Sequence, residues 1–168
     1  MKQKRSGIRN GMNSSRELLL MKSNYLLRYH DFYFQRIAKL KEQVKELRIK
    51  LGNEEFRQHE IVKLAYRIRE ADQEIIPRDP NRPEYRLTGN LKKYRRYKQG
   101  LQRYRLFFCF SNQPKIILYL YLNDEKHLRK AGDKKDPYEE FKRLVAKGYF
   151  SHNPDDPKIQ KWIKSYQP

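Results

Sequence analysis

The spacing of apolar residues predicts two long helices in the first half of the chain. Between residues 31 and 51, apolar side chains recur at intervals of three and four, at Tyr33, Ile37, Leu40, Val44, Leu47 and Leu51. This is the period of an amphipathic helix, with Asp31 available to cap its start and Gly52 to end it. A similar stripe predicts a second helix over 54–74, and a short strand over 24–29 is expected before the first helix.

Strand signals dominate the second half. Three prolines within 77–83 indicate a stiff connector, because proline fits neither a helix interior nor a central strand. Strands are then predicted over 91–98, 104–110 and 115–122. Gly100 marks a turn between the first two, and 111–114 is expected to form a hairpin loop between the last two.

A final helix is predicted by its start signals. Asp136, Pro137 and Glu139 stand in the order of an N-cap, a first-turn proline and the partner of a capping box, and Gly148 is expected to end the helix. The resulting order, β-α-α-β-β-β-α, predicts an α+β domain with an antiparallel sheet and helices on one side. His30, between the first strand and the first helix, is expected to serve helix entry or core packing.

The domain organisation follows from these elements. Residues 1–16 are basic and polar and are expected to form a flexible tail. We expect a single domain over 17–148 and a C-terminal tail over 149–168, in which Trp162 is a candidate to dock back onto the domain.

Charge defines the class of partner. The chain carries 39 Lys and Arg against 20 Asp and Glu, a formal net charge of +19, which indicates a polyanion: nucleic acid first, an anionic membrane surface second. An aromatic content of 13% argues against a disordered chain. The single cysteine, Cys109, leaves no internal disulfide and no cysteine-based zinc site, and no leader or membrane span is evident, so a cytoplasmic location is expected.

The positive charge is concentrated in one stretch. Residues 85–115 contain no Asp or Glu, although they carry many Lys and Arg with tyrosines interleaved. Cations that neutralise phosphates beside rings that stack on bases are features of an RNA surface. The alternative is a generally basic protein whose charge happens to fall here. The candidate RNA-binding residues are Arg86, Lys92, Lys93, Tyr94, Arg96 and Arg103, with Arg129 beyond the stretch.

The sequence offers no metal or other cofactor site for chemistry on RNA. One cysteine and four scattered histidines lack the spacing of metal ligands, and the acid-free stretch has no carboxylates to hold Mg²⁺. Attack by the RNA 2′-hydroxyl needs only a base, an acid and cations. Strand alternation would place Arg103 and Arg105 on one face of the second predicted strand, with Tyr104, Leu106 and Phe108 facing the core.

An ordered set of short matches resembles the YhaV toxin family of type II toxin–antitoxin systems, within the RelE-like superfamily. The matches are Tyr85-Arg86-Leu87, Gly89-Asn90, Tyr94-Arg95-Arg96, Arg103 to Phe108, Leu122 to Lys126, Leu128-Arg129, Asp136-Pro137-Tyr138 and Phe141. They are densest over 84–141. The tail over 1–16 extends beyond the family pattern, and the chain after Gly148 is only loosely similar to it.

The resemblance implies a fold, an activity and partners. The fold would be a RelE-like antiparallel or mixed sheet packed against two N-terminal helices, with a C-terminal helix. The activity would be that of an endoribonuclease that cleaves mRNA, free or on the ribosome, and so inhibits translation. The partner would be an acidic PrlF-like antitoxin, through which the complex would contact operator DNA. No membrane is implied.

The resemblance and the chemistry of the residues together give the candidate site residues. By the resemblance, Arg105 corresponds to the superfamily's strand arginine near the scissile phosphate. The bidentate geometry of arginine makes Arg95 a second candidate phosphate ligand. The candidates for proton transfer are Lys98, Lys126, His127 and Tyr138, of which Tyr138 resembles the tyrosine near the last helix. The structural alternatives are a solvated arginine for Arg105, simple packing for Tyr138 and a surface histidine for His127. For the whole chain, the alternative is a non-catalytic basic RNA-binding module.

Overall fold

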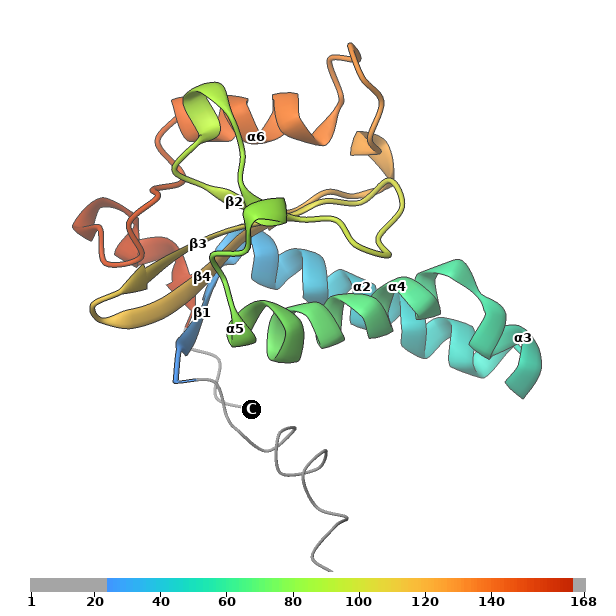
Figure 1. The fold of residues 1–168 in the computed structure, drawn as a ribbon. Helices are drawn as coiled ribbons and strands as arrows, with labels where there is room; N and C mark the ends of the chain where they lie inside the picture. The colour runs from blue at the N-terminus through green and yellow to red at the C-terminus, as the bar shows by residue number, and fades with distance from the viewer. Residues whose placement is uncertain (1–23, 165–168) are drawn as a thin grey trace, which may run out of the picture.

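The computed structural model describes residues 24–164, so the basic tail expected over 1–16 lies outside the described part. Figure 1 shows the elements in chain order. The helices are α2 (Asp31–Lys50), α3 (Asn53–Gln58), α4 (Glu60–Glu70), α5 (Ile76–Arg78) and α6 (Pro137–Ala146). The strands are β1 (Leu26–His30), β2 (Arg95–Tyr97), β3 (Leu106–Asn112), β4 (Lys115–Leu122) and β5 (Ile163–Lys164). The α+β class is confirmed.

The sheet is mixed, with strand order β2-β3-β4-β1-β5. β1 runs parallel to β4, whereas the β2–β3, β3–β4 and β1–β5 pairs are antiparallel. A register shift between Phe107 and Phe108 interrupts the β3–β4 ladder. Because the bulge adds a residue to β4, Leu120 and Tyr121 both pack on the face of the sheet that α6 covers.

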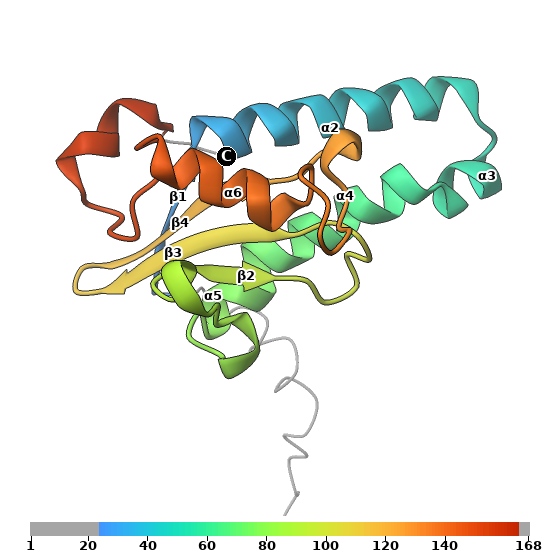
Figure 2. The same cartoon turned by 90° about the horizontal axis from the view of Figure 1, so that it is seen from above.

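Helices cover both faces of this sheet, so the one-sided arrangement expected from the sequence is wrong. Figures 1 and 2 show α2, α4 and α5 on one face and α6 on the other. The cause lies in β3 and β4, which are apolar at nearly every position. Phe108 and Tyr119 pack toward α2 and α4, while Phe107 and Leu118 pack toward α6, and all four are fully buried. Burying each such side chain contributes roughly 1.5–3 kcal/mol.

The first helix has nearly its predicted bounds but a different cap. His30 is completely buried, and its Nδ1 accepts a hydrogen bond from the Phe32 backbone N–H at 3.2 Å. Its Nε2 lies 2.9 Å from the Tyr149 carbonyl oxygen, to which it donates. Burial lowers the pKa of His30, which favours the neutral ring that this pair of hydrogen bonds requires. His30, rather than Asp31, therefore caps α2, and it joins the start of the chain to the segment after α6.

The second predicted helix is interrupted. His59 ends α3 and caps α4, and its Nδ1 accepts from the Ile61 N–H at 3.2 Å. A π-helical turn over Ala71–Ile75 follows α4 and leads into α5, which contains Pro77. The connector expected over 77–83 thus begins later than predicted, because Pro77 lies in the helical segment that continues from α4 through the π-helical turn into α5.

The basic strands are shorter than their sequence pattern indicated. Of the strand predicted over 91–98, only Arg95–Tyr97 pairs with β3, because a 3₁₀ turn occupies Gly89–Leu91. The strand predicted over 104–110 begins at Leu106 and continues to Asn112. Residues 98–105 form a loop instead, in which Gln102 has a positive φ of 52°. The strand predicted over 115–122 is confirmed.

The last helix has the predicted cap without the capping box. The Asp136 carboxylate accepts from the Tyr138 N–H at 3.0 Å. Glu139 instead pairs with Lys142 at 3.1 Å, and the Asp136 N–H bonds to the Asp133 carbonyl. The helix ends at Ala146, and Gly148 adopts the positive φ of 80° that glycine accommodates without strain.

Residues after 148, expected as a tail, contribute to the core over the part that the structure describes. Phe150 and Ile159 are 5% and 1% exposed and pack with Phe141 on the α6 face. Trp162 stacks on His30 with ring centroids 6.1 Å apart, and β5 then pairs with β1. The docking considered for Trp162 is therefore present.

The π-helical turn buries a carboxylate on the α2 face of the sheet. Asp72 is 6% exposed, accepts a hydrogen bond from the Tyr33 hydroxyl at 2.6 Å, and accepts another from Gln73 at 3.1 Å. The Tyr119 hydroxyl donates to the Asp72 carbonyl at 2.5 Å. Burial raises the pKa of Asp72 from 3.8 to about 6, against the opposing effect of its hydrogen bonds.

This carboxylate predicts a specific pH dependence of stability. The folded chain holds the Asp72 proton up to about pH 6 and the unfolded chain only to about 3.8, so this group's contribution to stability is lost as pH rises from 4 to 6. We expect Asp72→Asn to match the wild type near pH 4 and to exceed its free energy of unfolding by about 3 kcal/mol at pH 7.5. Urea denaturation at both pH values measures this, and a pH-independent difference would contradict it.

Candidate active site

Two arginines lie over the ring of one tyrosine at the start of α6, and a third arginine lies close to them. The guanidinium carbons of Arg129 and Arg96 lie 5.1 and 6.0 Å from the centre of the Tyr138 ring. Arg105 and Arg129 are close enough to Arg96 to add to the lowering of its pKa, which burial causes in the first place and Tyr138 opposes. We call Arg96, Arg105, Arg129 and Tyr138 the arginine cluster. It joins residues from β2, the loop before β3, the loop after β4 and α6.

One buried amide holds two of these loops together. Asn123, at the end of β4, is fully buried, and its Oδ1 accepts from the Arg105 backbone N–H at 2.6 Å. Its Nδ2 donates to the carbonyls of Arg103 and His127 at 3.2 and 2.8 Å. The Arg129 N–H also bonds to the Arg103 carbonyl at 3.0 Å. Asn123 therefore sets the positions at which Arg105 and Arg129 leave the backbone.

The Arg105 side chain is held by carbonyls of its own loop. Its Nη1 donates to Gln102 and Tyr104 at 2.6 and 2.7 Å, while its Nε is buried without a partner among residues 24–164. Arg103 and Arg105 precede β3, so the alternation expected to place them on one strand face is wrong. The loop conformation, not a strand, orients Arg105.

The cap of α6 also positions Arg129. Asp136 is 3% exposed, and its Oδ2 accepts from Arg129 Nη1 at 2.5 Å and from the Lys130 N–H at 2.8 Å. Its Oδ1 accepts from the Tyr138 N–H, so one carboxylate orients both residues. The Tyr138 ring meets Phe107 edge-on, with centroids 5.5 Å apart. Tyr138 therefore packs against the core and also belongs to the arginine cluster.

The second phosphate ligand expected, Arg95, lies in a neighbouring group. Its guanidinium sits 5.3 Å from the Phe110 ring centre and donates to Asn81 at 3.2 Å. Burial lowers the pKa of Arg95, and Arg86, which forms a β-bridge with it, adds to the effect. The three lysines of this region are exposed: Lys92, Lys93 and Lys98.

The aromatic part of the RNA-surface prediction is not supported. Tyr94 is 5% exposed, its hydroxyl donates to the Phe150 carbonyl at 3.4 Å, and its ring meets Phe141 edge-on. A ring buried in this way cannot stack on a base. Tyr85 and Tyr97 are also buried, so the tyrosines between the cations belong mainly to the core.

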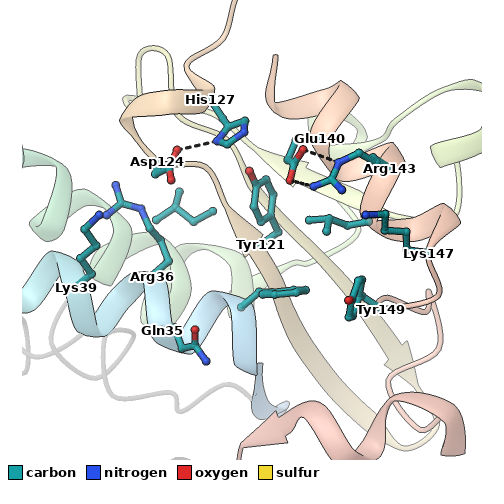
Figure 3. A pocket seen from close by; sticks show the side chains of 13 residues that line it. Gln35, Arg36, Lys39, Tyr121, Asp124, His127, Glu140, Arg143, Lys147 and Tyr149 are labelled. Carbon is teal, nitrogen blue, oxygen red and sulfur yellow. Dashed lines mark hydrogen bonds and ion pairs between the residues drawn. The ribbon is translucent and has the colours of Figure 1, made fainter. Parts of the chain in front are cut away.

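Of the other proton-transfer candidates, His127 lines a pocket, and Lys126 precedes it in the chain. His127 Nδ1 lies 2.8 Å from Asp124 Oδ1, and the ring lines a pocket of about 550 Å³ between α2 and α6 (Figure 3). Lys126 is exposed, and its backbone N–H bonds to Asp124 at 3.0 Å. Tyr138, by contrast, has Arg96 and Arg129 over its ring. Of the predicted catalytic residues, only Arg105 and Tyr138 belong to the arginine cluster. The others lie outside it: Arg95, Lys98, Lys126 and His127.

Sequence reasoning did not single out Asn123 or the second role of Asp136. A polar residue directly after an eight-residue apolar strand was the available signal for Asn123, because a buried amide there must find partners in adjacent loops. Among residues 24–164, no group of three or more His, Cys, Asp or Glu side chains could hold a metal ion. Over the same residues, no helix has the length and apolar character needed to cross a bilayer.

The fold and the site define a basic α+β domain with clustered arginines. Residues 27–161 match the family of YhaV toxins, described as toxins with endonuclease activity of a toxin–antitoxin system, and the chain belongs to this family. The resemblance noted from the sequence is confirmed.

Curated relatives agree with this assignment. The chain is 33% identical over 101 residues to the ribonuclease toxin YhaV of Escherichia coli K12 and to toxin YhaV of the O157:H7 strain. Each match covers 57% of this chain and 66% of the relative, so the chain spans slightly less than two thirds of the curated relatives' length. No solved structure matches the chain significantly.

The role of Asn123 predicts a large cost for its removal. Asn123→Ala would leave the Arg105 N–H and the His127 carbonyl without partners in a part-buried place, while the Arg103 carbonyl keeps its bond from the Arg129 N–H. We expect the variant to lower the free energy of unfolding by about 3 kcal/mol. Asn90→Ala, at an exposed position, should cost less than about 0.5 kcal/mol. Urea denaturation of both variants tests this, and equal small effects would show that the amide does not hold the loops.

Proposed function

We propose that this chain is a toxin of a type II toxin–antitoxin system that cleaves mRNA and so inhibits translation. Family membership supports the class, and the arginine cluster supports the chemistry. The single observation that carries the proposal is the position of Arg96 and Arg129 over the Tyr138 ring, with Arg105 close to Arg96. The mixed sheet, with α2 and α4 on one face and α6 on the other, is in keeping with a RelE-like arrangement.

The arginines would hold the scissile phosphate. A guanidinium stays charged even where burial lowers its pKa, and it offers paired N–H donors that match phosphate oxygens. Arg105 and Arg96 each have a buried Nε without a partner among residues 24–164, which costs stability unless an acceptor arrives. A phosphate drawn to the cluster would meet donors that are already oriented, and those donors would stabilise the extra negative charge of the transition state.

Cleavage would use the substrate's own nucleophile. The 2′-hydroxyl loses its proton to a base and attacks the adjacent phosphorus, the bond to the 5′-oxygen breaks, and that oxygen takes a proton. The products are a 2′,3′-cyclic phosphate and a 5′-hydroxyl. Tyr138 is the proton-transfer group that lies within the arginine cluster, with cations on its ring. Lys98, Lys126 and His127 remain predicted contributors to proton transfer or RNA contact.

The partners follow from charge and family. An acidic PrlF-like antitoxin would neutralise a chain of net charge +19, and the resulting complex would contact operator DNA through the antitoxin. Cleavage of mRNA, free or on the ribosome, places the toxin in the cytoplasm. Arg86, Lys92, Lys93, Arg95 and Arg103 would bind the RNA backbone beside the cluster.

Variants of the cluster should abolish cleavage without unfolding the chain. Arg105→Ala removes a phosphate ligand, and Tyr138→Phe removes a hydroxyl that can transfer a proton; we expect each to slow RNA cleavage about 100-fold or more. Arg57→Ala and Tyr66→Phe, at exposed positions on α3 and α4, should keep wild-type rates. Cleavage of a labelled RNA measures the rates, and circular dichroism confirms the fold.

Two results would overturn this assignment. Undiminished cleavage by Arg105→Ala would remove that residue from the mechanism. RNA that stays intact with the wild-type protein, together with normal growth on expression without an antitoxin, would favour the alternative of a non-catalytic RNA-binding module.

The proposed chemistry also predicts activity without a divalent metal. Because the 2′-hydroxyl attacks and the protein supplies the cations, cleavage should continue at an undiminished rate in excess EDTA and leave 2′,3′-cyclic phosphate ends. Mass spectrometry of the fragments identifies the ends. Loss of cleavage on chelation, with recovery on adding Mg²⁺, would refute the metal-free mechanism.

A further inference from the structure

A second site lies on the α2 side of α6, in the pocket of about 550 Å³ shown in Figure 3. Arg36 and Lys39 reach it from α2, and Arg143 and Lys147 reach it from α6, with Tyr121 of β4 between the two helices. Its volume falls in the range of small-ligand pockets. The arginine cluster contributes no residue to its lining.

Arg36 gives this pocket a buried cation that is only partly paired. Its side chain is 7% exposed, its Nε donates to the Asn123 carbonyl at 3.3 Å, and its Nη2 pairs with Glu125 at 3.4 Å. Nη1 is buried and has no partner among residues 24–164. Two long hydrogen bonds compensate a buried guanidinium poorly, so an anionic ligand on this side chain would be stabilised strongly.

The rest of the lining fits a nucleotide. Lys39 and Lys147 are exposed on opposite helices and can meet a phosphate. Arg143 is already ordered by two hydrogen bonds to Glu140, at 3.0 and 2.5 Å. The rings of Phe32, Tyr121 and Tyr149 are only partly buried, unlike the ring of Tyr94, and offer surfaces for a base.

Two acidic residues of the pocket lining favour a nucleotide over an acidic peptide as the ligand. Asp124 and Glu140 repel every anion, so they oppose the many carboxylates of an acidic peptide more than the single phosphate of a nucleotide. Their oxygens can also accept hydrogen bonds from the amino groups of bases. We propose that the pocket binds one nucleotide unit, with its phosphate on Arg36, Lys39 and Lys147 and its base against the aromatic rings.

The site adjoins the arginine cluster through one residue. The backbone carbonyl of Asn123 accepts from Arg36, and its side chain holds the backbone of Arg105. A nucleotide flanking the cut in a bound RNA is therefore one source of the ligand, which rests on the proposed function. A free mononucleotide is the other source, and it requires no nuclease activity.

Titration of the full-length, isotope-labelled chain with AMP, GMP, CMP and UMP tests the site by NMR. We expect saturable shifts at the pocket residues with at least one nucleotide. Lys39→Ala and Lys147→Ala should each weaken binding about fivefold or more. Lys45→Ala on α2 and Lys142→Ala on α6 remove the same charge outside the pocket and should stay within about twofold.

A cleavage assay distinguishes the two sources of the nucleotide, bound RNA and a free mononucleotide. If the Lys39→Ala/Lys147→Ala variant raises KM for RNA severalfold at unchanged kcat, the pocket holds part of the substrate. If KM is unchanged while mononucleotide binding is lost, the pocket takes a free nucleotide.

Several results would overturn the proposal. These are the absence of saturable shifts with all four nucleotides, equal weakening in the control variants, and a glutamate-rich peptide that saturates the pocket where no nucleotide does. NMR binding needs no cleavage, so failure of the nuclease assignment would leave this test intact.

Discussion

Burial of the β3–β4 pair on both faces is the constraint from which the rest of the structure follows. Strands that are apolar at almost every position need cover on both sides, so the chain must supply two layers of helix. One layer comes from α2 and α4, and the other from α6 with the segment that contains Phe150 and Ile159. Asn123 and the loop that carries Arg105 lie at one end of this pair.

The arginine cluster and the pocket between α2 and α6 lie on opposite sides of α6, and they differ in chemistry. On one side of α6 the cations are arginines that meet a tyrosine, an arrangement suited to a phosphate under attack. On the other side, the lysines and arginines surround partly exposed rings, an arrangement suited to holding a base and a phosphate without reaction. A long RNA could contact both.

Local patterns predicted those elements that depend on local interactions. The period of α2, the apolar run of β4 and the Asp136 cap are properties of adjacent residues, and they were predicted closely. Interactions between distant segments were missed. His30 replaced Asp31 as a cap because it also reaches Tyr149, and the two-sided sheet depended on how residues after 148 return to it.

The sequence predicted which residues form the candidate site but not where the fold places them. Arg96, Arg105, Arg129 and Tyr138 were all proposed from the sequence, yet Arg105 was expected on a strand and lies in a loop. The cause is Asn123, whose amide bonds to the Arg105 N–H at a point where strand pairing would otherwise begin. No pattern around residue 105 reports a partner 18 residues away.

The pairing of β1 has a consequence for how the protein is made. β1 lies between β4 and β5, so its hydrogen bonds wait for segments that follow it by about 90 and more than 130 residues. On a ribosome, the first strand emerges early, can pair with β4 only after residue 122 has been added, and can pair with β5 only later still. His30 likewise waits for Tyr149. The core around β1 therefore closes only after these distant segments have been made.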